Sequence, residues 1–296
     1  MGEMKKTETD LGMYELGYFE LEALLAEIRK AFYQNPSSVY LEPFRILGNL
    51  YYVGDKRVCA HLIDTGEGLI LFDAGFQHTI HLLIQSIWSL GFNPADVKYL
   101  ILSHGHFDHF GACNEFRSLY GAKSFMSKAD CEMLKNTPTA GLLDMNPNPY
   151  AQLPIIDYEF QDGEIISLGN THIECVLSPG HSPGTTSFFF DITDSGKTYK
   201  VGYFGGSGFL TLYRDFLKKY GLPLELQEQF AKTLNNLKCR QVDISLGNHP
   251  AQNSTLKKRH LMIENPAVNP FIDPTEWCVY LNKLEIQYRE FLKKGH

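Results

Sequence analysis

Long apolar stretches are missing from this sequence of 296 residues. No run approaches the roughly 20 consecutive apolar residues that a membrane-spanning helix requires. The first ten residues, Met-Gly-Glu-Met-Lys-Lys-Thr-Glu-Thr-Asp, place no apolar segment after their lysines, so they do not resemble a signal peptide. We therefore expect a cytoplasmic protein that does not associate with a membrane.

Basic residues are fewer than acidic residues in this chain. Lysine and arginine number 27 against 34 aspartates and glutamates, which gives a net charge of −7 and a pI of about 5.9. The short basic run 257–259 is expected to be a solvated loop or helix face. This balance excludes a broad nucleic-acid surface and favours a small-molecule substrate as the partner. It leaves the oligomeric state open.

Cysteine is sparse, and its spacing is uninformative. The six cysteines form no Cys-x-x-Cys pair, so we expect reduced core residues rather than a disulfide framework. None lies in the histidine-rich segment described below, so a thiolate nucleophile has little support. A serine nucleophile is not expected either.

The apolar pattern predicts a single α/β domain with layered sheets. Helices are expected over 14–34, 79–90, from near 112, over 223–237 and over 276–292. Strands are predicted at 50–53, 58–63, 69–72, 97–102, 156–160, 164–168, 171–177, 185–191, 199–204 and 242–246. Residues 136–154, rich in proline, asparagine and glycine, are expected to form a long surface loop.

The strongest chemical signal is the segment 103–109, Ser-His-Gly-His-Phe-Asp-His, directly after the strand 97–102. It contains four metal-capable side chains within six residues: His104, His106, Asp108 and His109. His181 and His249 also follow predicted strands, so the three loops converge if these strands share a sheet edge. The remaining histidines are expected at the surface: His61, His78, His81, His172, His260 and His296. For His78, whose loop follows a strand, a place at the border of the site is the alternative.

The ligand types favour zinc. Imidazoles with one carboxylate suit zinc and also iron, nickel or copper, whereas an all-oxygen calcium or magnesium cage is excluded. A structural zinc is the alternative, but such sites are usually closed by cysteines, and histidine-rich sites more often keep a position for water. The segment therefore indicates a catalytic metal.

These motifs resemble those of a known family. Ser-His-x-His-x-Asp-His, the segment 179–184 (Pro-Gly-His-Ser-Pro-Gly) and the segment 247–249 (Gly-Asn-His) are similar to ligand motifs of the metallo-β-lactamase superfamily. The segments 43–54, 62–68 and 269–275 resemble its third subclass, so the resemblance covers most of 43–290. It implies a four-layer αβ/βα sandwich over residues 43–296, preceded by an N-terminal helical extension over residues 1–42.

The resemblance also implies a set of metal ligands. Many superfamily members carry a bridging aspartate or a cysteine where this chain has Gly206 or Ser207, and the third subclass instead recruits the equivalent of His109. We therefore expect two zinc ions per chain as cofactors. The implied ligands are His104, His106 and His181 for one zinc, and Asp108, His109 and His249 for the other.

Three further roles follow as expectations. Asp108 is the expected catalytic residue, holding the second zinc and orienting the attacking hydroxide. Asp73 either accepts a hydrogen bond from a ligand imidazole or merely forms a turn. Ser207 either binds a substrate carboxylate or hydrogen-bonds only to the backbone of its own glycine-rich turn. Many members of the subclass have a C-terminal disulfide, which leaves the pairing of Cys239 with Cys278 open.

The function implied is that of a dinuclear zinc hydrolase, which opens a β-lactam or similar cyclic amide by attack of a metal-bound hydroxide. The alternative is a cytosolic zinc hydrolase of a lactone, thioester or other small ester on the same fold. Three other classes stay open with less support: a diiron redox protein, a nuclease or phosphodiesterase, and a binding module without catalysis. A carboxylate usually replaces the residue at 106 in the diiron relatives, and the acidic pI speaks against a large nucleic-acid substrate.

Overall fold

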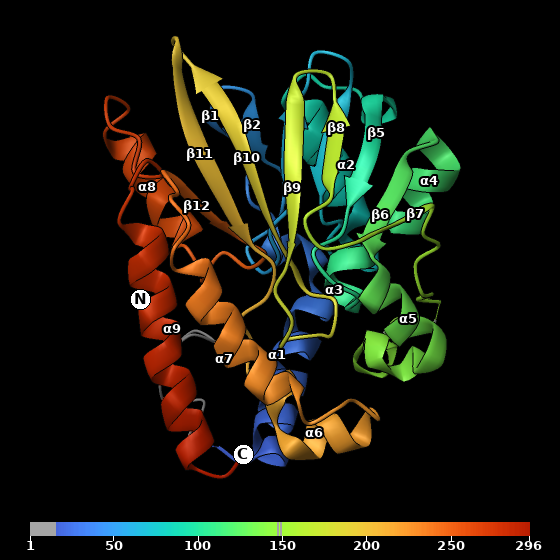
Figure 1. Cartoon of the computed structure of the whole chain (residues 1–296). Helices are drawn as coiled ribbons and strands as arrows, with labels where there is room; N and C mark the ends of the chain where they lie inside the picture. The colour runs from blue at the N-terminus through green and yellow to red at the C-terminus, as the bar shows by residue number, and fades with distance from the viewer. Residues whose placement is uncertain (1–15, 147, 149) are drawn as a thin grey trace, which may run out of the picture.

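The structure is a computed structural model that describes residues 16–146, 148 and 150–296. Within these residues two β-sheets pack face to face, and helices cover their outer faces (Figure 1). The first sheet contains, in spatial order, β1 (Phe44–Leu47), β2 (Leu50–Tyr52), β3 (His61–Asp64), β4 (Leu69–Phe72), β5 (Val97–Ile101), β6 (Lys123–Ser127) and β7 (Tyr158–Phe160). The second contains β12 (Ile244–Gly247), β11 (Lys197–Phe204), β10 (Thr186–Asp194), β9 (Thr171–Leu177) and β8 (Ile165–Leu168).

Strand direction decides where the loops open. Strands β1 to β4 pair antiparallel, whereas β4 to β7 pair parallel. Parallel neighbours need a crossover, and the crossovers carry α2 (Ile80–Ser89), α4 (Cys113–Tyr120) and α5 (Lys128–Asn136). The loops that leave β4 and β5 therefore open at the same edge. In the second sheet, β11 and β12 are parallel and the other pairs antiparallel.

The core has two parts because side chains alternate along each strand. In β4, Ile70 and Phe72 face the second sheet, and Leu69 and Leu71 face the helices. Between the sheets, the ring of Phe72 lies 5.1 Å from that of Phe188. A strand buried on both faces reads as a continuous apolar run, which explains why the sequence predicted it correctly.

The outer face of the second sheet is covered by α7 (Leu226–Leu237) and α9 (Glu276–Lys293), with α8 (Thr255–Glu264) beside them in Figure 1. Trp277 and Leu281 of α9 are buried in the helix-facing part of the core. With α4 and α5 on the opposite side, the layers are helix, sheet, sheet and helix, which confirms the predicted four-layer αβ/βα sandwich. The shorter elements are α3 (Phe107–Phe110), α6 (Arg214–Lys219) and the 3-10 helices η2 (Pro36–Val39), η3 (Gln77–Thr79), η4 (Pro94–Asp96), η5 (Pro138–Gly141), η6 (Leu143–Met145) and η7 (Leu210–Leu212).

The N-terminal helix α1 (Tyr18–Gln34) lies at the end of the sheets where β5 finishes (Figure 1, blue). Tyr18 packs on Phe216 with ring centroids 6.1 Å apart, and Phe32 packs on Phe76 at 5.2 Å. The helix predicted over 14–34 therefore exists, although residues 14 and 15 lie outside the described part. The proposed boundary at residue 42 stays a prediction.

Several elements were not predicted: β1, β6, α5, α6 and α8. Strand β6 was not predicted because Lys123–Ser127 contains few residues with high β propensity. The expected surface loop 136–154 is partly ordered, since it contains η5 and η6; positions 147 and 149 of that loop lie outside the described residues. No helix in the described ranges is both long and apolar enough to cross a membrane.

Two expectations about individual residue types need correction. His61 is not a surface residue: it is fully buried between the rings of Tyr52 and Tyr203, at 5.5 and 5.6 Å. All six cysteines, each within the described residues, are free thiols. Cys239 and Cys278 are exposed and unbonded, so they neither pair nor belong to the core.

Candidate metal centre

The segment after β5 carries the dense group of ligand-type residues. His104 follows the strand, His106 precedes the short helix α3, and Asp108 and His109 lie on that helix. The backbone of the segment is fixed by a hydrogen bond from the N–H of Ala74 to the carbonyl of His109 at 2.7 Å. The three histidines are buried, so their rings point into the protein rather than into solvent.

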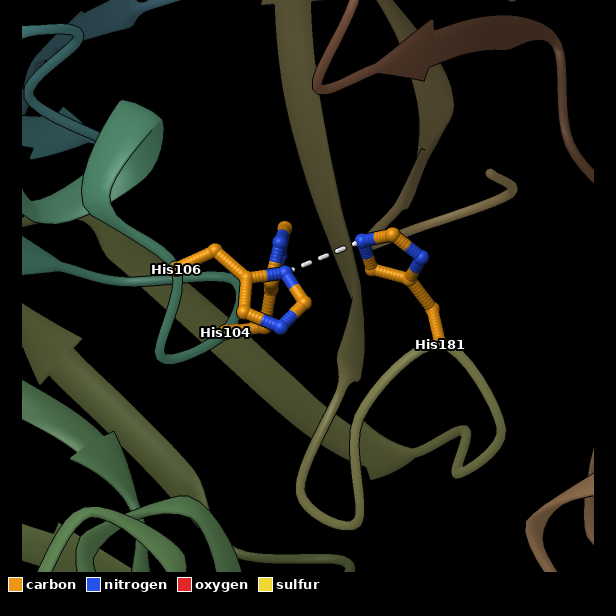
Figure 2. A group of neighbouring side chains, drawn as sticks. All are labelled: His104, His106 and His181. Atoms are coloured by element: carbon orange, nitrogen blue, oxygen red, sulfur yellow. Dashed lines mark hydrogen bonds between the residues drawn. The ribbon is translucent and has the colours of Figure 1, made fainter. Parts of the chain in front are cut away.

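Three imidazoles converge from the two sheets. His104 and His106 come from the first sheet, and His181 comes from the loop between β9 and β10 (Figure 2). One ligand atom from each of the three lies within 4.8 Å of the others. The closest approach joins His106 Nδ1 and His181 Nε2, which are 3.2 Å apart. Two ring nitrogens at this distance need a proton or a metal ion between them.

The hydrogen bonds at the back of the rings decide which nitrogens carry lone pairs. His181 Nδ1 lies 2.9 Å from the carbonyl oxygen of Gly208, which can only accept, so this nitrogen donates and Nε2 keeps its lone pair. Ser103 Oγ donates to Asp73 at 2.8 Å and therefore accepts from His104 Nδ1 at 3.0 Å. His104 Nε2 is then also a lone-pair donor.

A second group lies beside the first. Ligand atoms of His104, Asp108 and His109 lie within 4.8 Å of one another. His249, after β12, places its Nε2 3.6 Å from Asp108 Oδ2. Its Nδ1 donates to the carbonyl of Arg57 at 2.8 Å, so Nε2 again carries the lone pair. The structure therefore brings together all six residues that the sequence singled out.

Burial and charge set the protonation states. Burial, with the neighbouring histidines, holds the pKa of His104 and of His106 well below the ordinary range. Burial also lowers the pKa of His181 to about 4. At neutral pH these three imidazoles are uncharged, which is the form that binds a metal.

Asp108 and His109 behave differently. Burial alone would raise the pKa of Asp108, but His109 and His249 beside it hold that pKa well below its usual range. Burial alone would lower the pKa of His109, but the carboxylates of Asp108 and Asp73 raise it to about 10. His109 Nε2 and Asp108 Oδ2 lie 3.3 Å apart, a contact that requires positive charge from a proton or a metal ion.

The residues present fit a metal ion. The buried Nε2 atom of His104 makes no hydrogen bond to any described residue, and that of His109 faces only the Asp108 carboxylate at 3.3 Å. Buried polar atoms are almost always satisfied, and a cation in the space they face would satisfy both. Imidazole nitrogens with one carboxylate suit zinc.

Comparison with known proteins agrees with this geometry. A sequence model of the Metallo-beta-lactamase superfamily matches residues 53–194. The hydroxyacylglutathione hydrolase GloC of Haemophilus influenzae is 32% identical over 155 residues, which are 52% of this chain and 70% of that protein. The chain belongs to the metallo-β-lactamase superfamily.

Solved structures of the superfamily share the fold over most of this chain. A subclass B3 metallo-beta-lactamase of Bradyrhizobium japonicum superposes with a TM-score of 0.77 at 28% identity, over 88% of this chain and 97% of that chain. The metallo-beta-lactamase GOB-18 of Elizabethkingia meningoseptica gives 0.75 at 31% identity, over 88% and 95% of the two chains. These matches confirm the predicted likeness to the third subclass, and this chain is a metal-dependent hydrolase.

Asp73 lies behind the candidate metal ligands. It is fully buried at the end of β4 with a φ of 55°. Its Oδ2 accepts hydrogen bonds from His109 Nδ1 at 2.9 Å, Tyr203 Oη at 2.6 Å and Ser103 Oγ at 2.8 Å. Its Oδ1 accepts from the Ser103 N–H at 2.7 Å. The residue therefore does more than turn the chain.

The stretch after β11, where relatives carry a bridging acid or a thiol, has no space for a side chain at Gly206. A Cβ there would lie 2.8 Å from Cδ2 of His181. Next to it, Ser207 is half-buried, and its hydroxyl oxygen accepts from Gln252 Nε2 at 3.0 Å. The Ser207 hydroxyl hydrogen is thus left for another acceptor.

The segment Gly180–Gly184 has the Gly-x-Ser-x-Gly spacing of a serine nucleophile, but its context is different. It joins two antiparallel strands rather than a strand and a helix. Ser182 is fully buried and donates to Asp130 Oδ2 at 2.8 Å. It is therefore unavailable to a substrate.

The sequence missed three residues around the site. Asn248 donates to the carbonyl of Gly205 at 2.6 Å and so ties the His249 loop to the end of β11. Tyr33 of α1 stacks on His78 with centroids 3.9 Å apart, and burial with the charge of Asp108 raises its pKa. Asp130 is buried behind the ligand loops. Of the three, only Asp130 could have been noticed from the local sequence, because Ser127 and Asp130 have the spacing of an N-cap residue and the third residue of a helix.

Proposed function

We propose that the chain is a dinuclear zinc hydrolase that opens a β-lactam or similar cyclic amide. The observation that carries the proposal is the pair of ligand groups, built on a scaffold that superposes over 88% of the chain with a subclass B3 metallo-beta-lactamase. His104, His106 and His181 would hold one zinc, and Asp108 and His109, with His249 Nε2 3.6 Å from the Asp108 carboxylate, would hold a second. Bound zinc supplies a Lewis acid and lowers the pKa of water towards about 7.

The residues of the chain supply orientation and proton acceptance. Asp108 is ionised at neutral pH and partly reaches the surface, with 19% of its side chain exposed. Its carboxylate therefore orients the attacking water and accepts a proton at Oδ. Ser207, whose oxygen is held by Gln252, donates its hydroxyl hydrogen to a carboxylate or carbonyl of the substrate.

The test combines metal analysis with turnover. Purified protein should contain about two zinc ions per chain and hydrolyse a chromogenic cephalosporin. His106→Ala should lose tight metal binding and turnover together, while Cys278→Ala, an exposed position on α9, should retain both. Full turnover after chelation and dialysis would contradict the proposal.

The second candidate is a zinc hydrolase of a lactone, thioester or other small ester. It is favoured by the curated relatives: GloC is named a hydroxyacylglutathione hydrolase, and AttM of Agrobacterium fabrum, 28% identical over 38% of this chain and 43% of that protein, an N-acyl homoserine lactonase. Both candidates use the same ligands. Comparing kcat/KM for a cephalosporin, an acyl homoserine lactone and a glutathione thioester decides between them.

A further inference from the structure

Asp130 is a fully buried carboxylate in the first turn of α5, behind the metal ligands. Its Oδ2 accepts hydrogen bonds from the N–H of Gly105 at 2.7 Å and from Ser182 Oγ at 2.8 Å. Its Oδ1 accepts from the N–H of Gly184 at 2.6 Å. These donors are uncharged, so the carboxylate is held by dipoles rather than by an ion pair.

The donors come from two separate ligand loops. Gly105 lies between His104 and His106, on the loop of the first sheet. Ser182 directly follows His181, and Gly184 ends the same turn on the second sheet. One carboxylate therefore bridges the loops that present the three imidazoles of Figure 2.

The contact is close on the second loop. A Cβ on Gly184 would lie 2.1 Å from Ser127 Oγ and 2.8 Å from Asp130 Cγ. The turn after His181 thus rests directly on the first turn of α5. The bases of the two loops are also joined by a backbone hydrogen bond from the Thr186 N–H to the Ser103 carbonyl at 2.9 Å. Nearer the ligands, no other side chain in the described chain accepts from both loops, so the carboxylate sets the spacing of their tips.

Asp73 supports His109 of the other group directly and reaches His104 of this group only through Ser103. It accepts from the Ser103 N–H and from His109 Nδ1, both on the segment after β5. We propose that Asp130 is a positioning residue that sets the distance between the His104–His106 loop and the His181 loop. It thereby fixes the metal affinity of that position and leaves the position of Asp108, His109 and His249 to Asp73. This inference rests on the zinc ligands proposed above.

The test is zinc binding by full-length Asp130→Asn. An amide has one oxygen, so its NH2 faces either the Gly184 N–H or the Gly105 N–H, and one loop is released in both cases. Zinc affinities are measured by competition with a chromophoric chelator, and cobalt titration followed by visible absorption identifies the position that weakens. Loss of supporting hydrogen bonds typically lowers metal affinity about 10- to 100-fold, and we expect a loss of that size at one position only.

The matched control is Asp157→Asn. Asp157 accepts from Arg117 Nη2 at 2.7 Å and from the Ser124 N–H at 2.9 Å, away from the ligands. This variant should lower the melting temperature and leave both zinc affinities unchanged. If Asp130→Asn fails to fold, Ser182→Ala removes one donor to the carboxylate and should weaken the same position about 5-fold.

The outcomes separate the inference from the proposed function. Unchanged affinities in Asp130→Asn, or an equal loss at both positions, overturn the positioning role. Wild-type protein that binds fewer than two zinc ions overturns the proposed function itself, and does so without reference to any variant.

Discussion

Replacing Asp73 by asparagine should separate its role as a hydrogen-bond acceptor from its role as a turn residue. Asparagine tolerates the left-handed conformation that position 73 requires, so the backbone is retained. Its single oxygen can serve the three donors on Oδ2, but its NH2 then opposes the Ser103 N–H. One hydrogen bond to a charged acceptor is lost and a buried donor is left unpaired, which destabilises the protein by about 2–4 kcal/mol.

The remaining three hydrogen bonds also weaken, because a neutral acceptor is roughly half as strong as an ionised one. His109 and, through Ser103, His104 are then held less firmly in the tautomers that leave Nε2 free for a metal. We expect zinc affinity to fall about 10- to 100-fold. Denaturant unfolding of the apo protein measures the first effect and chelator competition the second. A domain stable by about 5–15 kcal/mol still folds after the substitution.

Tyr203→Phe is the control, since it removes one donor to Oδ2 and keeps the carboxylate charge. It should lower stability by about 1–2 kcal/mol and change zinc affinity by less than about 3-fold. Folded Asp73→Asn protein with wild-type zinc affinity would refute the reasoning. Asp73 would then act only as a turn residue.

Three further substitutions test other parts of the structure. Burial raises the pKa of Asp55 to about 6, so the folded state binds a proton more tightly than the unfolded chain, and the stability of the protein falls as pH rises from about 4 to 6. Asp55→Asn keeps both hydrogen bonds to Oδ1. In denaturant unfolding the variant should match the stability of wild type near pH 4 and exceed it by up to about 3 kcal/mol at pH 7. Equal stability at pH 7 would contradict this. Gly206→Ala places a Cβ against the His181 ring and should cost at least about 10-fold in zinc affinity, whereas an unchanged affinity would show that the ring has room to move. Tyr33 lies near enough to Asp108 for its charge to act on the phenol, so Tyr33→Ala, which also removes the stack on His78, should raise KM with unchanged zinc content. Steady-state kinetics and metal analysis check this, and an unchanged KM would show that Tyr33 does not contact the substrate.

The features that the sequence predicted correctly have signals that lie close together in the chain. The segment 103–109 indicated a metal site because four ligand-type side chains lie within six residues. His181 and His249 were predicted because each follows an apolar strand and lies in a segment, 179–184 or 247–249, that resembles a ligand motif of the family. Strand β4 was predicted with its correct bounds because both of its faces are buried.

What the sequence did not predict depends on distant partners. Asp130 bonds to residues 25, 52 and 54 positions away, and no local pattern reports such contacts. His61 was placed at the surface because an isolated polar residue usually lies there. Its neighbours Leu62 and Ile63 are both buried, and a strand buried on both faces leaves its histidine no exposed side.

The passage from β7 to β8 divides the ligands between two contiguous pieces of chain. Strand β7 ends at Phe160 in the first sheet and β8 begins at Ile165 in the second, with Gly163 in the turn between them. Four proposed ligands precede this turn, and His181 and His249 follow it. A chain cut at residues 161–164 would yield two fragments, neither with a complete ligand set. Their reassociation would restore the site, so metal binding could serve as a reporter of fragment complementation.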